Sequence, residues 1–184
     1  MNIFFTASFR GKKTYQANYD KILKKLDELR LIVTSPEKNN YKALLNTSKT
    51  SHLKTKQEEH YLAIKKGIEW ADAVIMEISE EDFQLGHEAT LAIQANKHVL
   101  CLSIHEDYSQ KIKSRYFHGA KFNDYTYEEI LENFINKIST ETLHNRFNLF
   151  LSDRHKAHLE SKAKELGVNK SEYLRMVLDD TCRE

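Results

Sequence analysis

Glu88 is the carboxylate that the chain places best to do chemistry. It lies a short polar segment after the apolar run Ala71–Ser79 and directly after Gly86 and His87. We interpret this pattern as a buried strand, a loop at its carboxyl end, and a helix that begins near Gly86 with Glu88 on its first turn. Ligands bind at that edge of an open α/β sheet. A carboxylate held there can attack or stabilise an electron-poor carbon, as in retaining glycoside chemistry.

The elements that must position Glu88 follow from alternating short apolar runs and amphipathic stretches. We predict strands at residues 2–6, 31–34, 72–78, 98–104 and 120–124. We predict helices at residues 15–30, 57–70, 86–96, 106–116 and 126–138. The polar, lysine-rich segment 37–56 is expected to be a flap with a short helix at 41–45. Strands that alternate with helices predict a three-layer α/β fold, a Rossmann-like (flavodoxin-like) parallel sheet over residues 1–138, covered on both faces.

The pattern changes after residue 138. Residues 139–145 are expected to form a linker, and residues 146–184 a small strand-helix-helix module. Residues 146–151 alternate like a strand. Ser152 can cap a first helix that Gly167 ends, and Asn169 or Ser171 can cap a second. About 38 residues make too small a core to stand alone, so the module needs a partner, most simply a second copy of itself.

Composition bounds the classes of function. The chain has 184 residues, 40% of them hydrophobic, and a formal net charge of +1, so nothing global argues for a polyanionic partner. Cys101 and Cys182 are too few and too far apart for a disulfide scaffold or a zinc site, and we expect them to stay reduced in a cytoplasmic protein. No signal peptide and no apolar stretch near the ~20 residues of a membrane span is expected. The nine histidines show no metal-ligand spacing, so we predict no metal.

Four segments together resemble a known family. They are Phe5–Gly11 after the first strand, Ala71–Ser79, Gly86–Glu88 and Asn96–Leu102. In order and spacing they resemble the nucleoside 2-deoxyribosyltransferase superfamily, and within it most closely the 2′-deoxynucleoside 5′-monophosphate N-glycosidases. The resemblance covers about three quarters of the chain, residues 1–138.

The resemblance implies roles for named residues. Glu88 would be the nucleophile on the anomeric carbon of deoxyribose, with no cofactor. Its neighbours Gly86 and His87, and the loop that contains Ser8, Arg10 and Gly11, would meet the sugar and any 5′-phosphate. A guanidinium such as that of Arg10 can grip a phosphate with two hydrogen bonds, and a helix amino terminus offers free N–H groups to an anion.

Three positions depart from the family pattern. Phe4 stands where the glycosidases carry a tyrosine, and Ile64 where they carry an aspartate that helps the base to leave. Asp82 stands where a serine contacts the phosphate. The first two changes remove a hydroxyl and a general acid, which is worth roughly 10²–10⁴ in rate, unless another group such as His60 or His87 substitutes. Asp82 would repel a 5′-phosphate, which favours a nucleoside or a ligand whose phosphate lies elsewhere.

The tail resembles a ribbon-helix-helix module over residues 145–152, 163–167 and 170–175. Such modules pair their strands into a dimer, and as DNA binders lay that ribbon in the major groove. Arg146, Asn148 and Phe150 would then point outward. Arg146 and Asn148 are suited to reading bases, whereas Phe150 is not, and the tail lacks the basic excess of a phosphate-gripping surface.

Two hypotheses of function follow. The first is an N-glycosidase or deoxyribosyltransferase-like enzyme that acts on a nucleoside or nucleotide through Glu88. The alternative is a catalytically degenerate nucleotide-binding sensor, coupled to a tail that binds DNA or only oligomerises. Phe4 and Ile64 favour the alternative, because they delete accessory catalytic groups and leave the pocket. In either case at least a homodimer is expected, and no membrane partner.

Overall fold

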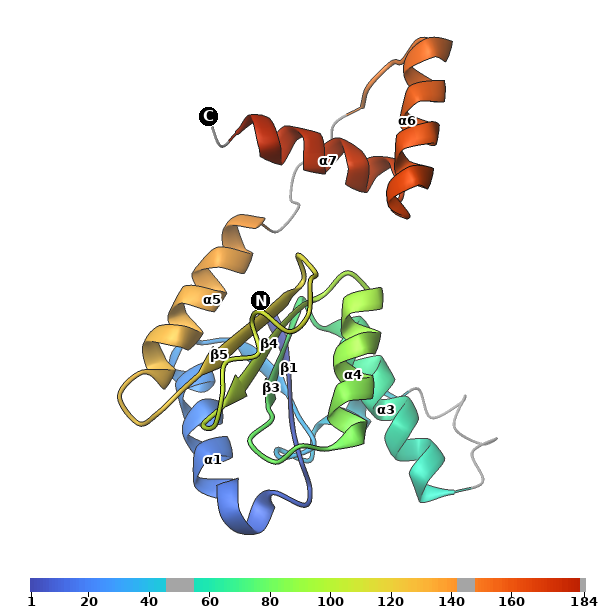
Figure 1. Cartoon of the computed structure of the whole chain (residues 1–184). Helices are drawn as coiled ribbons and strands as arrows, with labels where there is room; N and C mark the ends of the chain where they lie inside the picture. The colour runs from blue at the N-terminus through green and yellow to red at the C-terminus, as the bar shows by residue number, and fades with distance from the viewer. Residues whose placement is uncertain (46–54, 142–147, 183–184) are drawn as a thin grey trace. The chain divides into compact units, whose positions relative to one another are not determined.

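The computed structural model describes residues 1–45, 55–141 and 148–182. The chain consists of two compact units, Met1–Thr142 and Leu143–Glu184. The first unit contains a five-stranded parallel sheet with helices on both sides, as the sequence predicted (Figure 1). Its strands lie in the order β2-β1-β3-β4-β5, which is the flavodoxin-like order.

The sheet is built from β1 (Asn2–Ala7), β2 (Ile32–Thr34), β3 (Ala73–Glu77), β4 (His98–Ser103) and β5 (Phe117–Lys121). Its helices are α1 (Lys12–Glu28), the 3₁₀ helix η1 (Tyr41–Leu44), α3 (Lys56–Trp70), α4 (Phe83–Gln94) and α5 (Tyr127–Glu141). Residues 46–54 of the predicted flap lie outside the described residues. The short helix that we predicted at 41–45 is η1.

Two apolar cores lie on the two faces of the sheet. Side chains alternate along β1, so that Ile3 and Phe5 join one core while Phe4 joins the other. The first core lies beneath α1 and α5, and the second beneath α3 and α4 (Figure 1). Since β1 and β3 are neighbours whose connections leave toward opposite faces, the loops at their carboxyl ends meet at a topological switch point.

The helix predicted at 106–116 is wrong. This segment forms turns without a helix, and β5 begins at Phe117, earlier than the predicted strand at 120–124. The Asp107 side chain accepts a hydrogen bond from the backbone N–H of Ser109 at 2.7 Å, a local bond that competes with the helix. The backbone at Ser109 also packs so closely on Gly119 of β5 that no Cβ would fit between them.

The second unit contains two helices, α6 (Asp153–Leu166) and α7 (Lys170–Thr181). Ser152 caps α6, Gly167 ends it with a left-handed φ of 68°, and Asn169 caps α7, as the sequence predicted. Residues 148–152 form no strand, and the rest of the predicted ribbon, Arg146 included, lies outside the described residues. A ribbon strand pairs between two copies of such a module, so a single chain offers it no partner.

Candidate active site

Glu88 lies in the second turn of α4. Our prediction of a helix start near Gly86 was wrong, because α4 begins at Phe83 with Asp82 as its cap. The Glu88 side chain is buried, with 2% of its surface exposed. Its Oε1 accepts a hydrogen bond from Nε2 of Gln84 at 2.8 Å, whereas its Oε2 has no hydrogen-bond partner in the described part of the chain.

The surroundings of Glu88 favour the protonated form of its carboxyl and so raise its pKa. Burial raises the pKa of this carboxyl to about 7. The hydrogen bond from Gln84 and the proximity of Thr6 oppose this rise, whereas the charge of Asp82 adds to it. A buried carboxylate with a free oxygen and a pKa near neutrality can act as a nucleophile or as a proton carrier at pH 7.

Two adjoining cavities lie at this edge of the sheet. The first, of about 300 Å³, is lined by side chains that include Ser8, Lys12, Glu37, Tyr41 and Asp82. The second, of about 410 Å³, is lined by Glu88 together with residues that include Tyr61, Phe83 and His87. His60, Ile64 and Gln84 line both cavities. A molecule of nucleoside size therefore finds room beside Glu88.

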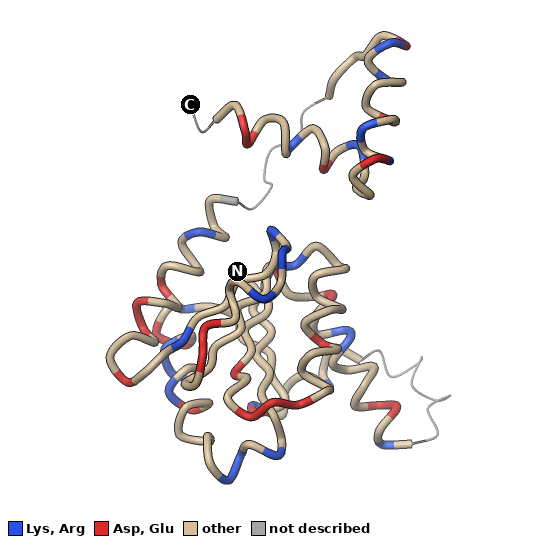
Figure 2. The backbone as a smooth tube through the Cα atoms, in the orientation of Figure 1, with Lys and Arg blue, Asp and Glu red and all other residues tan. Residues whose placement is uncertain are grey.

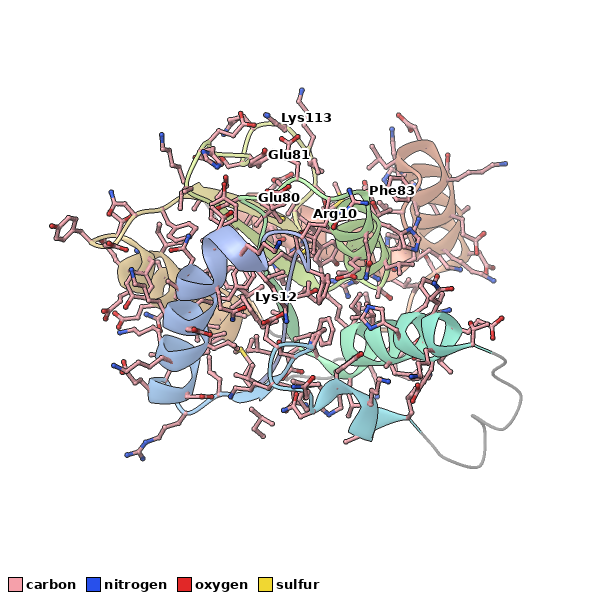
Figure 3. All side chains as sticks on the ribbon, turned by 90° about the horizontal axis from the view of Figure 1, so that it is seen from below. Arg10, Lys12, Glu80, Glu81, Phe83 and Lys113 are labelled. Atoms are coloured by element: carbon pink, nitrogen blue, oxygen red, sulfur yellow. The ribbon has the colours of Figure 1, made fainter. Side chains whose placement is uncertain are left out.

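Asp82 links the two loops of the switch point. Its Oδ2 accepts a hydrogen bond from the Ser8 hydroxyl at 3.0 Å, and its Oδ1 accepts one from the backbone N–H of Gln84 at 2.9 Å. Figure 3 views this edge, with Arg10 in the loop after β1, Glu80 and Glu81 in the loop after β3, and Lys12 and Phe83 at the starts of the helices that follow these loops. Figure 2 shows the acidic run Glu80–Asp82 in the segment that joins β3 to α4. The Asp82 carboxylate thus already interacts with the positive end of the α4 helix dipole.

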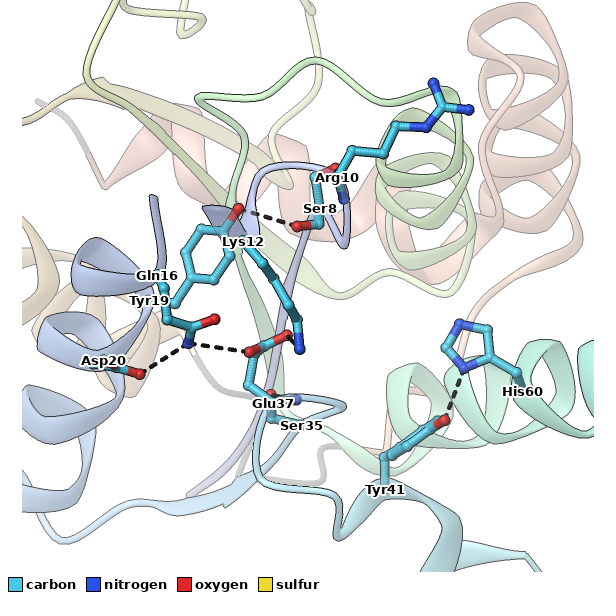
Figure 4. Close-up of polar contacts among 10 residues, drawn as sticks. All are labelled: Ser8, Arg10, Lys12, Gln16, Tyr19, Asp20, Ser35, Glu37, Tyr41 and His60. Carbon is cyan, nitrogen blue, oxygen red and sulfur yellow. Dashed lines mark hydrogen bonds and ion pairs between the residues drawn. The ribbon is translucent and has the colours of Figure 1, made fainter. Parts of the chain in front are cut away.

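Of the other residues predicted to bind substrate, His87 lines a cavity, whereas Arg10 does not. His87 lines the second cavity, where its ring stacks on Tyr61 at a centroid distance of 5.9 Å. Arg10 is exposed and is not among the residues that line these two cavities. In Figure 4 its side chain extends away from the ion pair of Lys12 with Glu37, which measures 3.0 Å. The structure therefore brings Lys12, and not Arg10, to the wall of the first cavity.

The two predicted glycine contacts also differ from expectation. Gly11 and Gly86 are absent from the lining of both cavities. A Cβ at Gly11 would collide with the Tyr19 hydroxyl and approach Glu80 closely, so this glycine allows tight packing. Nothing lies within 4 Å of a Cβ built at Gly86. The role of Gly11 that the structure supports is therefore packing.

Phe4 and Ile64 are apolar where the family pattern is polar, and both are buried. The ring of Phe4 packs directly against Gly67 of α3. Ile64 lines both cavities with its apolar side chain, at the position where the resemblance led us to expect an acid.

Gln84 and Tyr41 are cavity residues that the sequence interpretation missed. Tyr41 Oη lies 2.8 Å from Nδ1 of His60, and Nε2 of His60 lies 3.2 Å from Nε2 of Gln84 (Figure 4 draws the first of these contacts). Burial, and secondarily the charge of Lys42, lower the pKa of His60. Gln84 lies one turn before Glu88, a spacing that in a helix could have indicated their contact. No local signal links Tyr41 to α3.

The described residues contain no group of three or more histidine, cysteine or acidic side chains that could hold a metal ion. They also contain no helix that is both long and apolar enough to cross a membrane.

Comparison with known proteins gave one curated relative. It is the 5-hydroxymethyl-dUMP N-hydrolase of Danio rerio, 27% identical over 140 residues, which cover 71% of this chain and 90% of the relative. No family model matches the sequence.

Two solved structures share the fold. One is a 2-deoxyribosyltransferase from Bacillus psychrosaccharolyticus, with a TM-score of 0.53 and 19% identity, covering 75% of this chain and 96% of that one. The other is the CMP N-glycosidase of Clostridium botulinum, with a TM-score of 0.52 and 12% identity, covering 72% of this chain and 99% of that one. All three similar proteins bear names that denote chemistry at the glycosidic bond of nucleosides or nucleotides.

Proposed function

We propose, from the support that these comparisons give for membership of the nucleoside 2-deoxyribosyltransferase superfamily, that this protein cleaves the N-glycosidic bond of a nucleoside. One observation carries the proposal. Glu88 is a buried carboxylate with one oxygen unpartnered in the described chain, and it lines a cavity at the carboxyl edge of the sheet. Leaving such an oxygen without a partner costs stability, which a functional role would explain.

The chemistry proceeds in two displacements. An oxygen of ionised Glu88 forms a bond to the anomeric carbon as the bond from that carbon to the base nitrogen breaks, and the base takes the electron pair. The resulting glycosyl ester is opened by water, which makes the protein a hydrolase, or by a second base, which makes it a transferase. The methyl groups of Ile64, which lines the same cavity as Glu88, make part of this wall apolar, and an apolar wall strengthens electrostatic effects at the reacting carbon.

The substrate we favour carries no 5′-phosphate. Asp82 holds a negative charge at the α4 amino terminus and binds Ser8, so a phosphate would meet a like charge where it would otherwise find free N–H groups. Lys12, which lines the first cavity, is already paired with Glu37. A neutral sugar hydroxyl, in contrast, can donate a hydrogen bond to the Asp82 carboxylate.

The test is release of free base. The purified protein is incubated with 2′-deoxynucleosides, ribonucleosides and their 5′-monophosphates, with and without a second free base, and products are separated by chromatography. We expect the wild type to release or exchange a base, Glu88→Gln to lose this activity, and Glu129→Gln, an exposed position on α5, to retain it. Failure of every substrate to release base contradicts the proposal.

The alternative function is binding without turnover. The apolar replacement of two catalytic positions by Phe4 and Ile64 favours it, since the cavities persist without those groups. Titration calorimetry separates the two functions. Tight nucleoside binding that is unchanged in Glu88→Gln, with no base released, supports a sensor and contradicts an enzyme.

We further propose that the unit Leu143–Glu184 joins two copies of the chain. Leu159 and Ala163 are its buried apolar side chains, whereas Leu149, Phe150 and Leu178 are more than half exposed in the described part. Such an apolar surface on a small unit calls for a partner, and a second copy satisfies it.

Mass measurement by light scattering tests the dimer, and we expect Leu149→Glu to halve the mass while Asn148→Ala leaves it unchanged. A wild-type monomer contradicts the dimer. DNA binding is a separate question about the outward face. A gel shift that is lost in Arg146→Ala and Asn148→Ala, with the dimer intact, would support it.

A further inference from the structure

A chain of side-chain contacts leads from Glu88 across the cavity wall to Tyr41. Gln84 Nε2 bonds Oε1 of Glu88 at 2.8 Å and lies 3.2 Å from Nε2 of His60. Nδ1 of His60 then lies 2.8 Å from the Tyr41 hydroxyl (Figure 4). The chain joins α4, α3 and η1, so it spans both cavities and ends at the first of them.

The direction of each hydrogen bond follows once Glu88 is ionised. Its carboxylate can only accept, so Gln84 presents its NH₂ group, and the second hydrogen of that group is directed to Nε2 of His60. His60 is therefore neutral, and its proton is on Nδ1, from which it donates to the Tyr41 oxygen. The Tyr41 hydroxyl proton is then not consumed within the chain. It is available to a molecule in the first cavity, which Tyr41 lines.

We propose that Tyr41 is the acid that protonates the leaving base, with His60 and Gln84 as the positioning residues that aim its proton. This rests on the proposed function, because it concerns the same bond cleavage. It also supplies the group that Ile64 removes from the family pattern. Tyr41 is a residue of η1 and has no counterpart among the motifs that identify the family here.

The step balances without any further reactant. As the base nitrogen receives the electron pair of the broken glycosidic bond, the Tyr41 oxygen gives its proton to the base and becomes a phenolate. The Nδ1–H of His60, already directed at that oxygen, stabilises the phenolate. When water opens the glycosyl ester of Glu88, its proton returns to Tyr41, and the products are the free sugar and the free base.

His60 itself is less suited to be the acid. Its Nε2 accepts from Gln84 and its Nδ1 faces Tyr41, so neither nitrogen presents a proton to the cavity. Burial also lowers its pKa, which keeps the ring neutral at pH 7. Asp82 is an acceptor for Ser8 and for the α4 backbone. Tyr41 thus presents to this cavity a hydroxyl proton that no other described residue accepts.

The test compares a substrate whose leaving group must be protonated with a substrate whose leaving group departs without a proton. Wild type, Glu88→Gln and Tyr41→Phe are assayed on a 2′-deoxynucleoside and on 4-nitrophenyl 2-deoxyribofuranoside, whose leaving group departs as a stable anion. We expect Tyr41→Phe to lower kcat on the nucleoside by roughly 10²–10⁴-fold, the range of a positioned acid, and to change cleavage of the nitrophenyl compound by less than about tenfold. Tyr15→Phe is the matched control, because the Tyr15 hydroxyl also contacts a histidine, lying 3.1 Å from Nε2 of His105, and Tyr15 lines neither cavity.

A double-variant comparison gives a second measurement on the natural substrate alone. If His60 acts through Tyr41, His60→Ala lowers kcat, and adding it to Tyr41→Phe lowers kcat no further. The assignment of Tyr41 is overturned if folded Tyr41→Phe keeps full activity on the nucleoside, or if it loses the same activity on both substrates. In either case the proposed function still stands, provided that the wild type is active and Glu88→Gln is not. If the wild type cleaves neither substrate, the proposed function itself is overturned.

Discussion

The hydroxyl of Ser8 donates a hydrogen bond to Oδ2 of Asp82 at 3.0 Å, which joins the loop after β1 to the start of α4 across 74 residues of sequence. Since Asp82 also caps α4, one carboxylate fixes both loops of the switch point. It also fills the helix amino terminus, a place where proteins commonly bind anions. Because Asp82 places a negative charge at this site, we expect it to disfavour ligands that carry a 5′-phosphate.

Removal of the Asp82 charge should admit a 5′-phosphate. We expect Asp82→Ser to lower the ratio of kcat/KM for a deoxynucleoside to that for its 5′-monophosphate by about tenfold or more, as the loss of one nearby like charge implies. Serine also caps helices, so the change in stability should be small. Asp82→Asn keeps the shape and removes the charge, and it should behave like serine. A ratio that neither variant changes would show that Asp82 does not face the phosphate position.

Under the proposed function, the pKa of Glu88 sets the pH dependence of base release. Burial raises it to about 7, and a carboxylate nucleophile must be ionised to attack. We therefore expect kcat/KM to rise about tenfold per pH unit below pH 7 and to level off above it. Gln84→Ala removes a hydrogen bond that lowers this pKa, so the curve should move to higher pH. A profile that is flat between pH 5 and 8 would contradict the assignment of Glu88 as nucleophile.

The fold could be predicted from the sequence because its signals are local. An apolar run such as Ala73–Glu77 indicates a strand that is buried on both faces, and an amphipathic stretch such as α1 indicates a helix that is buried on one face. The capping residues Ser152 and Asn169 bond backbone groups that are close in sequence. The start of α4 was missed although Asp82 is a common capping residue. The segment 106–116 was misjudged because its turns depend on the close approach to Gly119.

The candidate site was harder to predict for the same reason. The motifs around Ser8 and Glu88 indicated two loops at one sheet edge, which local sequence can do. The contact of Tyr41 with His60 joins residues 19 apart in sequence, across the segment 46–54 that the structure does not describe. Spacing also gave no direction for Arg10, whose side chain turns away from the cavity wall that Lys12 forms.

Glu77 gives a prediction about stability. It is fully buried in β3, where Ser79 donates to its Oε1 and its Oε2 has no partner in the described chain. Burial raises its pKa from an ordinary value of 4.5 to about 7, so its contribution to stability is complete below about pH 4.5 and is lost as the pH rises through 7. Glutamine cannot ionise and avoids this loss.

We therefore expect Glu77→Gln to raise the free energy of unfolding by about 1–3 kcal/mol at pH 8.5 and by much less at pH 5. Chemical denaturation at the two pH values measures both quantities. The exposed control Glu129→Gln should change the free energy little at either pH. An equal gain for Glu77→Gln at both pH values would mean that ionisation is not the cause.

Substitution by alanine should change the free energy of unfolding in opposite directions at Gly67 and at Gly86. Both lie inside helices, where alanine normally stabilises by about 0.5–1 kcal/mol relative to glycine. A Cβ at Gly67 would collide with the buried ring of Phe4, whereas a Cβ at Gly86 meets nothing within 4 Å. Because Phe4 is held in β1 between two neighbouring strands, its ring has little freedom to move aside.

We expect Gly67→Ala to lower the free energy of unfolding by about 1–3 kcal/mol, the usual cost of overpacking a core, and Gly86→Ala to raise it by about 0.5–1 kcal/mol. Denaturant midpoints of the two variants, compared with wild type at one pH, measure the difference. The double variant Gly67→Ala, Phe4→Leu should recover part of the loss, because the smaller side chain vacates the space that the new methyl group needs. If Gly67→Ala stabilised the protein as Gly86→Ala does, the ring of Phe4 would not be held against α3.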